Sequence, residues 1–185
     1  MNDPLADLVS RAQSGDRAAL GHLISQTHGQ VYNLAYRILG NAQEAEDLTQ
    51  EIFVRMWRGL PRFRGHSKFT TWLHAITTNT CLNRRRKLRQ KLENEIDHEE
   101  FFEQFSSSFG NPAQETVRQD QREGLWKAIE ELPQKYSLIL ALFYQQQLSY
   151  KEIAEVLSVP LGTVKGHLSR ARRALAASLK RMEMV

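Results

Sequence analysis

Apolar residues recur every three or four positions along the first 90 residues, which is the spacing of one face of a helix. Leu20 and Leu23 begin one such series, which continues to residue 39. No sustained alternation of apolar and polar residues is present, so we do not expect strands. Gly15-Asp16 and Gly40-Asn41 are typical of helix boundaries. The pattern predicts helices over about residues 5–12, 20–39, 42–59 and 70–92.

Helical spacing resumes near residue 117, after a stretch without periodicity. Leu125, Ile129 and Leu132 form one stripe, which Pro133 ends. Ser149 and Glu152 have the spacing of a capping box, in which each side chain satisfies a backbone amide at a helix start. Further helices are predicted over 137–146, 149–157 and 162–181. Since every predicted element is a helix, the fold class is all-α.

The two helical parts are separated by residues 93–119. Six acidic residues and no Lys or Arg lie between Glu93 and Glu103, and Ser106 to Pro112 reads SSSFGNP, a composition with low ordering tendency. The chain length suits two small domains, each with a modest core. We therefore expect a helical bundle over 1–92 and a second helical domain over 120–185, joined by a flexible acidic linker.

Positive charge is concentrated in two zones of this chain, whose net charge is +4. Six of the eight residues in 84–91 are basic, and 160–182 carries six basic residues without an acid. Such a distribution is compatible with nucleic-acid binding, although many solvated surfaces are mildly basic.

Several classes of protein do not fit the sequence. The single cysteine, Cys81, excludes an internal disulfide, and the six histidines lack the spacing of a metal site, so we expect neither metal nor cofactor. Catalysis would require convergent acids, a metal set or an activated nucleophile, and Cys81 is better explained as a buried helix residue. No apolar run is long enough to span a membrane, and charges interrupt any signal-peptide core near the N-terminus. We expect a cytoplasmic protein without membrane insertion.

Residues 149–175 have the spacing of a helix-turn-helix. Ile153, Val164 and Leu168 are apolar where the two helices must bury their inner face, while the outer face of the second helix is basic. Arginine in a major groove reads guanine edges, and lysine holds phosphate. The alternative is a basic, solvated helix in an ordinary bundle. The residues expected to contact duplex DNA are Thr163, Lys165, Gly166, Ser169, Arg170, Arg172 and Arg173.

With the helices that precede it, this segment resembles the C-terminal domain, region 4, of the extracytoplasmic-function (ECF) sigma factors of bacterial RNA polymerase. The resemblance implies that the second helix reads the minus-thirty-five promoter element. Ser158 stands where the family often has glycine, and Gly166-His167 replaces a more usual Ser-Arg pair. A glycine inside a helix costs about 1 kcal/mol relative to alanine, but it lets the backbone approach a phosphate closely.

A second resemblance to the same family lies in the N-terminal part, at the motif DLTQEIFVRMW from Asp47 to Trp57. Taken alone, this stretch is an amphipathic surface helix, with apolar stripes from Leu48, Ile52, Phe53 and Trp57. In the family, the similar helix docks on the clamp helices of the polymerase core. The residues to which the resemblance gives this role are Asp47, Gln50, Glu51 and Val54.

The segment from Phe63 to Thr80 interleaves aromatic, basic and small polar residues. Aromatic faces stack on unpaired bases for about 1 to 3 kcal/mol each, although Phe69 and Trp72 are as easily explained as core residues. In the family, the similar loop forms a pocket for a flipped base of the minus-ten element, and the next helix presents Asn to the melted strand. The matching positions are Phe63, Arg64, Gly65, His66, Ser67, Lys68, Asn79 and Asn83, with Arg84, Arg85, Arg86 and Lys87 expected on backbone phosphates.

Two motif sets in the same order predict a sigma factor: a non-catalytic initiation factor that binds core RNA polymerase, recruits it to a two-part promoter and stabilises the melted strand. The resemblance implies core polymerase, promoter DNA and an anti-sigma factor as partners, and a monomer when free. One alternative is a helix-turn-helix regulator of the response-regulator effector type, but the N-terminal half lacks the alternating strands and helices of a receiver domain. Another is an enzyme acting on nucleic acid.

Overall fold

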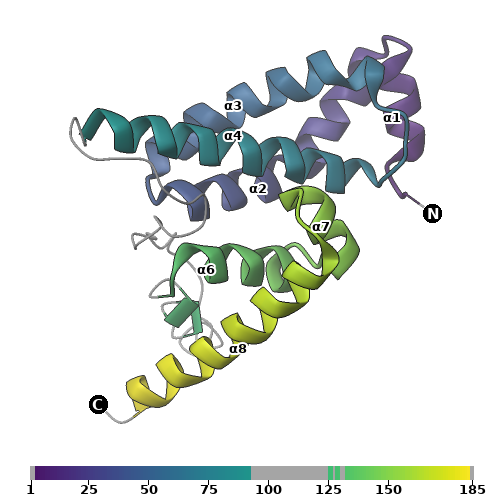
Figure 1. Cartoon of the computed structure of the whole chain (residues 1–185). Helices are drawn as coiled ribbons and strands as arrows, with labels where there is room; N and C mark the ends of the chain where they lie inside the picture. The colour runs from purple at the N-terminus through teal and green to yellow at the C-terminus, as the bar shows by residue number, and fades with distance from the viewer. Residues whose placement is uncertain (1–2, 93–124, 127, 130–131, 184–185) are drawn as a thin grey trace.

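The computed structural model describes residues 3–92, 125–126, 128–129 and 132–183, and the regular secondary structure of these residues is helical. The predicted acidic linker at 93–119 lies outside the described residues. Figure 1 shows the arrangement of the helices in space. The elements are α1 (Ala6–Gln13), α2 (Arg17–Leu39), α3 (Ala42–Gly59), the 3-10 turn η1 (Leu60–Arg62), α4 (Phe69–Leu92), α6 (Gln134–Leu140), the π-helical turn η2 (Ala141–Gln145), α7 (Tyr150–Leu157) and α8 (Leu161–Glu183).

The N-terminal domain is a bundle in which α2, α3 and α4 pack on one another, while α1 packs against α2. Its centre is apolar and fully enclosed: Leu23, Leu34, Ile52 and Met56 have no exposed surface. Burial of this kind stabilises the bundle by roughly 1.5 to 3 kcal/mol for each large apolar side chain. The four helices predicted from the sequence are confirmed here.

The helix boundaries of this domain follow from local hydrogen bonds. The Oδ1 atom of Asp16 accepts from the amides of Ala18 and Ala19, at 2.9 and 3.0 Å, so Asp16 caps α2. At the other end of α2, Gly40 adopts the left-handed conformation, with φ of 70°. Asn41 then caps α3 by accepting from the Glu44 amide at 3.0 Å. These contacts confirm the predicted boundaries, since each joins residues within four positions.

The C-terminal domain is formed by α6, α7 and α8, with Leu142, Ile153 and Val164 enclosed between them. The capping box is confirmed: the Glu152 amide donates to Ser149 Oγ at 3.3 Å, and the Ser149 amide donates to Glu152 Oε2 at 2.8 Å. The predicted helix over 137–146 was wrong at its start. It begins at Gln134 because proline, which lacks an amide proton, can directly precede a first helical turn.

Ser158 ends α7 in the left-handed conformation, with φ of 53°. An L-residue with a side chain is strained there, whereas glycine is not. We therefore expect Ser158→Gly to raise the free energy of unfolding by about 1 kcal/mol, measured by urea or thermal unfolding followed by circular dichroism.

The matched control is Ser25→Gly, in the exposed interior of α2, where the same change should lower stability by about 0.5 kcal/mol. Equal destabilisation by both substitutions would contradict the conformation assigned to Ser158.

Candidate polymerase and DNA interfaces

The outer face of α3 carries the residues predicted to bind core polymerase. Asp47, Gln50, Glu51 and Val54 are all exposed. Because they are spaced by three or four residues, they form one continuous strip along the helix. This strip, defined by these four residues, is called the α3 strip below.

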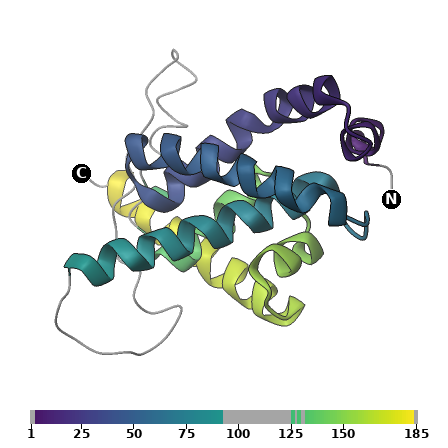
Figure 2. The same cartoon turned by 90° about the horizontal axis from the view of Figure 1, so that it is seen from above.

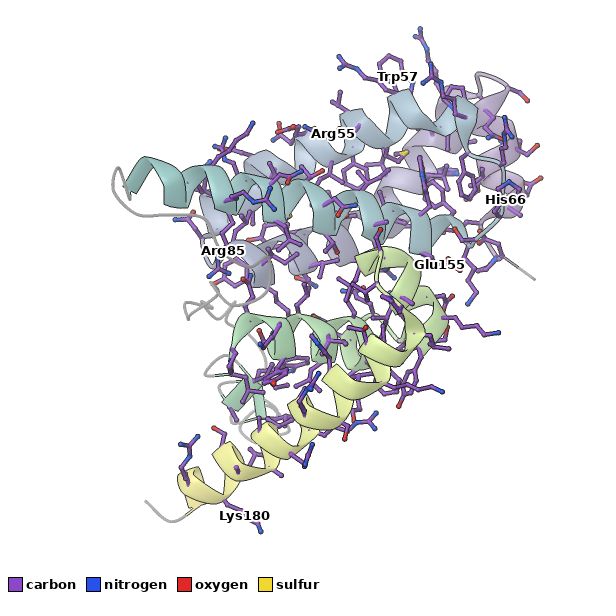
Figure 3. All side chains as sticks on the ribbon, viewed as in Figure 1. Arg55, Trp57, His66, Arg85, Glu155 and Lys180 are labelled. Atoms are coloured by element: carbon purple, nitrogen blue, oxygen red, sulfur yellow. The ribbon has the colours of Figure 1, made fainter. Side chains whose placement is uncertain are left out.

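Trp57 extends the α3 strip, contrary to its assignment to an apolar stripe with Leu48, Ile52 and Phe53. Those three side chains are buried, but Trp57 is 57% exposed, next to Val54 at 44%. Figure 3 shows Trp57 pointing away from the domain. The place of Trp57 on this face could have been predicted from the sequence, since Trp57 lies three positions after Val54. The result is an exposed apolar pair beside acidic residues.

The acidic groups of the α3 strip are only weakly neutralised within the chain. Arg55 Nη2 lies 2.6 Å from Glu51 Oε1, an ion pair in which both side chains are about half exposed. Gln43 Nε2 donates to Asp47 Oδ1 at 3.3 Å. Exposed pairs at this spacing contribute little stability and exchange readily with other partners.

The loop between η1 and α4 is built on an aromatic cluster of Phe63, Phe69 and Trp72. The ring of Phe63 lies 4.9 Å from that of Trp72 and 6.1 Å from that of Phe69. Phe69 is fully buried, which supports its interpretation as a core residue, whereas Phe63 and Trp72 are half-buried. Phe63 therefore presents only part of its ring outside the core.

The loop residues beyond Phe63 are held out toward solvent. Arg64, Gly65 and His66 are exposed, and Gly65 has a φ of 69°, a left-handed conformation that favours glycine. Figure 3 shows His66 at the end of the molecule where α1 lies. A partly open cavity of about 300 Å³ lies between this loop and the N-terminal segment. Its lining residues are Asp3, Ala6, Val9, Ser10, Gln13, Phe63, Arg64, Gly65, Ser67 and Lys68.

On α4, Asn79 and Asn83 are exposed and share one face, as the spacing of four predicts. The arginines that follow do not all face the same way. Arg84 Nε lies 2.9 Å from Glu44 Oε2 in α3, and Arg85 Nη1 donates to the Ile38 carbonyl at 3.0 Å, at the end of α2.

Consecutive helical residues point about 100° apart, so three adjacent arginines cannot present a single surface. Arg84 and Arg85 are thus turned toward their own domain, and Figure 3 labels Arg85 near the end of α2. Arg86 is exposed. In the predicted phosphate-binding run, Arg85 is thus bound to the end of α2, whereas Arg84 and Arg86 are exposed and Arg84 is paired with Glu44.

Two buried groups on α4 are chemically silent at neutral pH. Burial lowers the pKa of His74 to about 4, against the opposing charge of Glu152, so His74 is neutral. Burial, and then the charge of Glu51, raise the pKa of Cys81 to about 12, so its thiol stays protonated. In the described part of the chain no group of three or more His, Cys, Asp or Glu is placed to hold a metal ion. None of the described helices is long and apolar enough to cross a membrane.

The second helix of the helix-turn-helix, α8, exposes most of the predicted DNA contacts. Lys165, Ser169, Arg170 and Arg173 are exposed. At the start of this helix, the Thr163 amide donates to the Pro160 carbonyl at 2.9 Å. Its hydroxyl, and not its amide, is the group that a phosphate contact would use.

Arg172 is anchored within the domain by three aromatic residues. Its Nε donates to Tyr144 Oη at 3.1 Å, its Nη2 to Tyr150 Oη at 3.5 Å, and the guanidinium lies 5.1 Å from the Phe143 ring centre. Such contacts fix α8 against η2 and α7. The Arg172 side chain, which is predicted to contact DNA, is thus already oriented by contacts within its own domain.

The structure explains His167 of the Gly166-His167 pair, but not Gly166. The His167 ring packs edge-on against Tyr136, with centres 6.4 Å apart, and burial lowers its pKa. A side chain at position 166 would approach Arg170 Nη2 to 3.6 Å, an ordinary contact. His167 therefore serves the packing of α8 on α6, while nothing in the structure requires glycine at 166.

The two domains touch through α4 and α7, which lie side by side in Figures 1 and 2. Lys68 Nζ lies 3.0 Å from Glu152 Oε1, and the Thr71 hydroxyl donates to the same oxygen at 3.3 Å. Burial alone would raise the pKa of Glu152, but hydrogen bonds from Ser149 and Lys68 outweigh it and lower the pKa to about 2. Glu152 is therefore charged, with one oxygen in the cap of α7 and the other in the domain contact.

Further polar groups are buried at or near this interface. His74 Nδ1 and Thr78 Oγ1, on the face of α4 that Thr71 shares, are buried and have no hydrogen-bond partner among the described residues. Gln134 in α6 donates to the Ile38 carbonyl at 3.3 Å. Interfaces with buried but unsatisfied polar groups are weaker than cores, and domains joined in this way are expected to separate.

Two helical domains, one with a helix-turn-helix and an exposed basic helix, define a DNA-binding protein of transcription. Comparison with known families and proteins identifies the class further. Residues 23–91 match Sigma-70 region 2, and residues 122–175 match Sigma-70 region 4. The chain is 33% identical to the ECF RNA polymerase sigma factor SigW of Bacillus subtilis, over 93% of this chain and 95% of that protein. It is also 33% identical to the ECF RNA polymerase sigma-E factor of Escherichia coli, over 95% of each.

The chain therefore belongs to the ECF family of RNA polymerase sigma factors, which are not enzymes. This membership removes the response-regulator and nuclease alternatives. Two solved structures share the fold. One is CnrH in complex with the cytosolic domain of CnrY, with a TM-score of 0.66 and 23% identity, covering 94% of this chain and 96% of that one. The other is the sigma factor RpoE in complex with the anti-sigma factor NepR from Bartonella quintana, with a TM-score of 0.69 and 21% identity, covering 86% of this chain and 96% of that one.

The domain contact can be weakened by substitutions that lie outside the loop 63–68. We expect Thr71→Val combined with Glu152→Gln to raise the separated population of the free chain roughly fivefold, because an ion pair and a hydrogen bond are lost. Glutamine at position 152 retains the capping box. The measurement is single-molecule energy transfer between dyes on cysteines introduced at the exposed residues Asn33 and Lys180, since Cys81 is buried and does not react.

The matched control is Glu155→Gln, which removes the same charge from an exposed position of α7. Identical distributions for the double variant and this control would show that Glu152 does not hold the domains together.

Proposed function

We propose that this ECF sigma factor uses three separate surfaces: the α3 strip for core polymerase, the loop 63–68 with the outer face of α4 for the melted minus-ten strand, and α8 for the minus-thirty-five duplex. The supporting observation is that these surfaces lie on different elements, so one can be occupied without covering another. The domains are region 2 over 1–92 and region 4 over 120–185, with residues 93–119 as the acidic linker between them.

Binding to core polymerase is assigned to Asp47, Gln50, Glu51 and Val54, and Trp57 is added. An exposed tryptophan beside an exposed valine suits the centre of an interface, where aromatic residues contribute most of the affinity. The flanking carboxylates suit a basic partner surface and would steer association. The combination of apolar centre and acidic edge supports a protein partner more than a nucleic acid, which would repel the carboxylates.

Contact with the melted strand is assigned to the loop and to α4. The cavity beside Arg64 and Lys68 is large enough for one base, while Asn79 and Asn83 offer exposed amides to neighbouring bases. Lys68 cannot hold a phosphate while it is paired with Glu152. Binding of the loop to DNA therefore competes with the contact between the domains.

Contact with duplex DNA is assigned to the exposed face of α8. Lys165, Ser169 and Arg173 lie on one face, at spacings that fit a major groove, and the absence of acidic residues from 161 to 182 favours the phosphate backbone. An arginine held in place by aromatic side chains, as Arg172 is, loses little side-chain entropy on binding. Recognition of the element as a duplex is consistent with this geometry.

An anti-sigma factor is proposed as a further partner, in the cytoplasm, of a chain that is a monomer when free. The support is the composition of the two structural neighbours, each of which is a complex with a second protein: the cytosolic domain of CnrY in one, and the anti-sigma factor NepR in the other. The residues that would bind such a partner are not assigned.

The test of the proposed function is transcription of sheared genomic DNA by sigma-free core RNA polymerase, with and without this protein, followed by mapping of RNA 5′ ends. We expect discrete protein-dependent starts that share an upstream motif of two elements. Identical start sites in both reactions would refute the proposal.

The α3 strip is tested separately by charge reversal. Asp47→Lys with Glu51→Lys should weaken binding to core polymerase by at least about 30-fold, because favourable charge pairs become repulsive. Fluorescence anisotropy of the labelled chain titrated with core polymerase gives the affinity. Asp7→Lys with Glu155→Lys changes the net charge equally, at exposed positions outside the strip, and should bind normally. Equal losses in the two double variants would assign the effect to net charge alone.

A further inference from the structure

The N-terminal helix α1 builds one wall of the cavity beside the minus-ten loop. Residues matched to Sigma-70 region 2 begin at position 23, so α1, which ends at Gln13, lies before them. Yet Ala6, Val9, Ser10 and Gln13 line the cavity opposite the loop. Packing of α1 against α2 and η1 fixes this wall relative to the bundle.

Gln13 holds the first end of the loop. Its Nε2 group donates to the Leu60 carbonyl at 2.9 Å and to the Phe63 carbonyl at 2.8 Å. A side-chain amide nitrogen has two protons, so both are used. One side chain of α1 thereby joins the start of η1 to the residue where the exposed loop begins.

Asp3 holds the other end of the loop. Its Oδ2 accepts from the Phe69 amide, the first of α4, at 2.6 Å, and its Oδ1 accepts from the Leu5 amide at 2.9 Å. A carboxylate at a helix start is further stabilised by the helix dipole. The six residues from 63 to 68 are therefore anchored at both ends by the N-terminal segment, while Arg64, Gly65 and His66 between them stay exposed.

We propose that Gln13 and Asp3 are positioning residues that set the width of this cavity, and thereby the base preference at one position of the melted minus-ten strand. The occupant is a single unpaired nucleobase, which the part-exposed ring of Phe63 contacts and which the hydroxyls of Ser10 and Ser67 can read at its edge. This inference rests on the proposed function of the loop.

The charges around the cavity favour one orientation of the strand. The Asp3 carboxylate accepts from the Phe69 amide and would repel a phosphate at the α4 end of the loop, where Lys68 is paired with Glu152. Arg64 is exposed near the other end of the loop. A nucleotide would therefore enter with its phosphate beside Arg64.

The experiment uses holoenzyme formed from the full chain and core polymerase, and a promoter found by start-site mapping, randomised at each position of its minus-ten element. Transcripts are counted by sequencing. For Gln13→Ala we expect the preference at one position to relax about fivefold, since two partly solvated hydrogen bonds are lost. Preferences at the other positions and affinity for core polymerase should not change. The control Gln26→Ala makes the same substitution at an exposed position of α2 and should change nothing.

A promoter with an abasic site at that position separates positioning from general stability. Transcription by wild-type holoenzyme should be lower from this promoter than from the intact one. Transcription by Gln13→Ala holoenzyme should already be reduced on the intact promoter and should fall little further on the abasic one. If Gln13→Ala prevents folding, Ser10→Phe is used instead, since it fills the cavity and leaves both hydrogen bonds of Gln13 in place. This variant should transcribe less than wild type from the intact promoter, and the difference between the two should disappear on the abasic promoter. A uniform loss at all positions would overturn the positioning role, and absence of any minus-ten preference in the wild-type holoenzyme would instead refute the proposed function of the loop.

Discussion

The structure depends on the division of α4 among three environments. Leu73 and Thr77 face the core of the N-terminal domain, Thr71 and His74 face α7, and Asn79 and Asn83 face solvent. This helix is covered by protein on two sides and has no single apolar stripe. Its second buried face contacts a domain that can separate from it, so this face must also be stable when it is exposed to water. Threonine and histidine meet that requirement, since they pack when covered and are hydrated when exposed.

The capping box of α7 joins this constraint to the C-terminal domain. Glu152 satisfies the start of its own helix with one oxygen and binds Lys68 and Thr71 with the other. The same carboxylate thus caps α7 and forms the ion pair between the domains. Separation of the domains would leave the cap intact, so the helix-turn-helix need not unfold when α7 leaves α4.

The three exposed surfaces are distributed so that each rests on a rigid base. The α3 strip stands on the buried residues Leu48 and Ile52, and α8 is fixed by Arg172 on an aromatic cluster. The loop before α4 is anchored at one end by Gln13 of α1 and at the other by Asp3, which precedes α1. Sites held on supported elements bind with less loss of conformational entropy than mobile ones. The arrangement gives a small chain three binding faces without one large core.

The sequence by itself determined the helices, their caps and the family. Asp16, Asn41 and the pair Ser149 and Glu152 could be placed because a cap depends on residues within four positions of each other, and the helical spacing of the α3 strip is equally local. That Asn79 and Asn83 share one face follows from the same periodicity.

Only the tertiary structure decided which of these side chains are already engaged. Trp57 proved exposed, Arg84 and Arg85 proved turned toward α3 and α2, and Gln13 reached a loop about 50 positions away in the chain. Periodicity gives the direction of a side chain around its own helix, but not which other helix lies in that direction. The contact of Lys68 with Glu152 joins two domains, and no local pattern could predict it, because it depends on how two separately folded bundles meet.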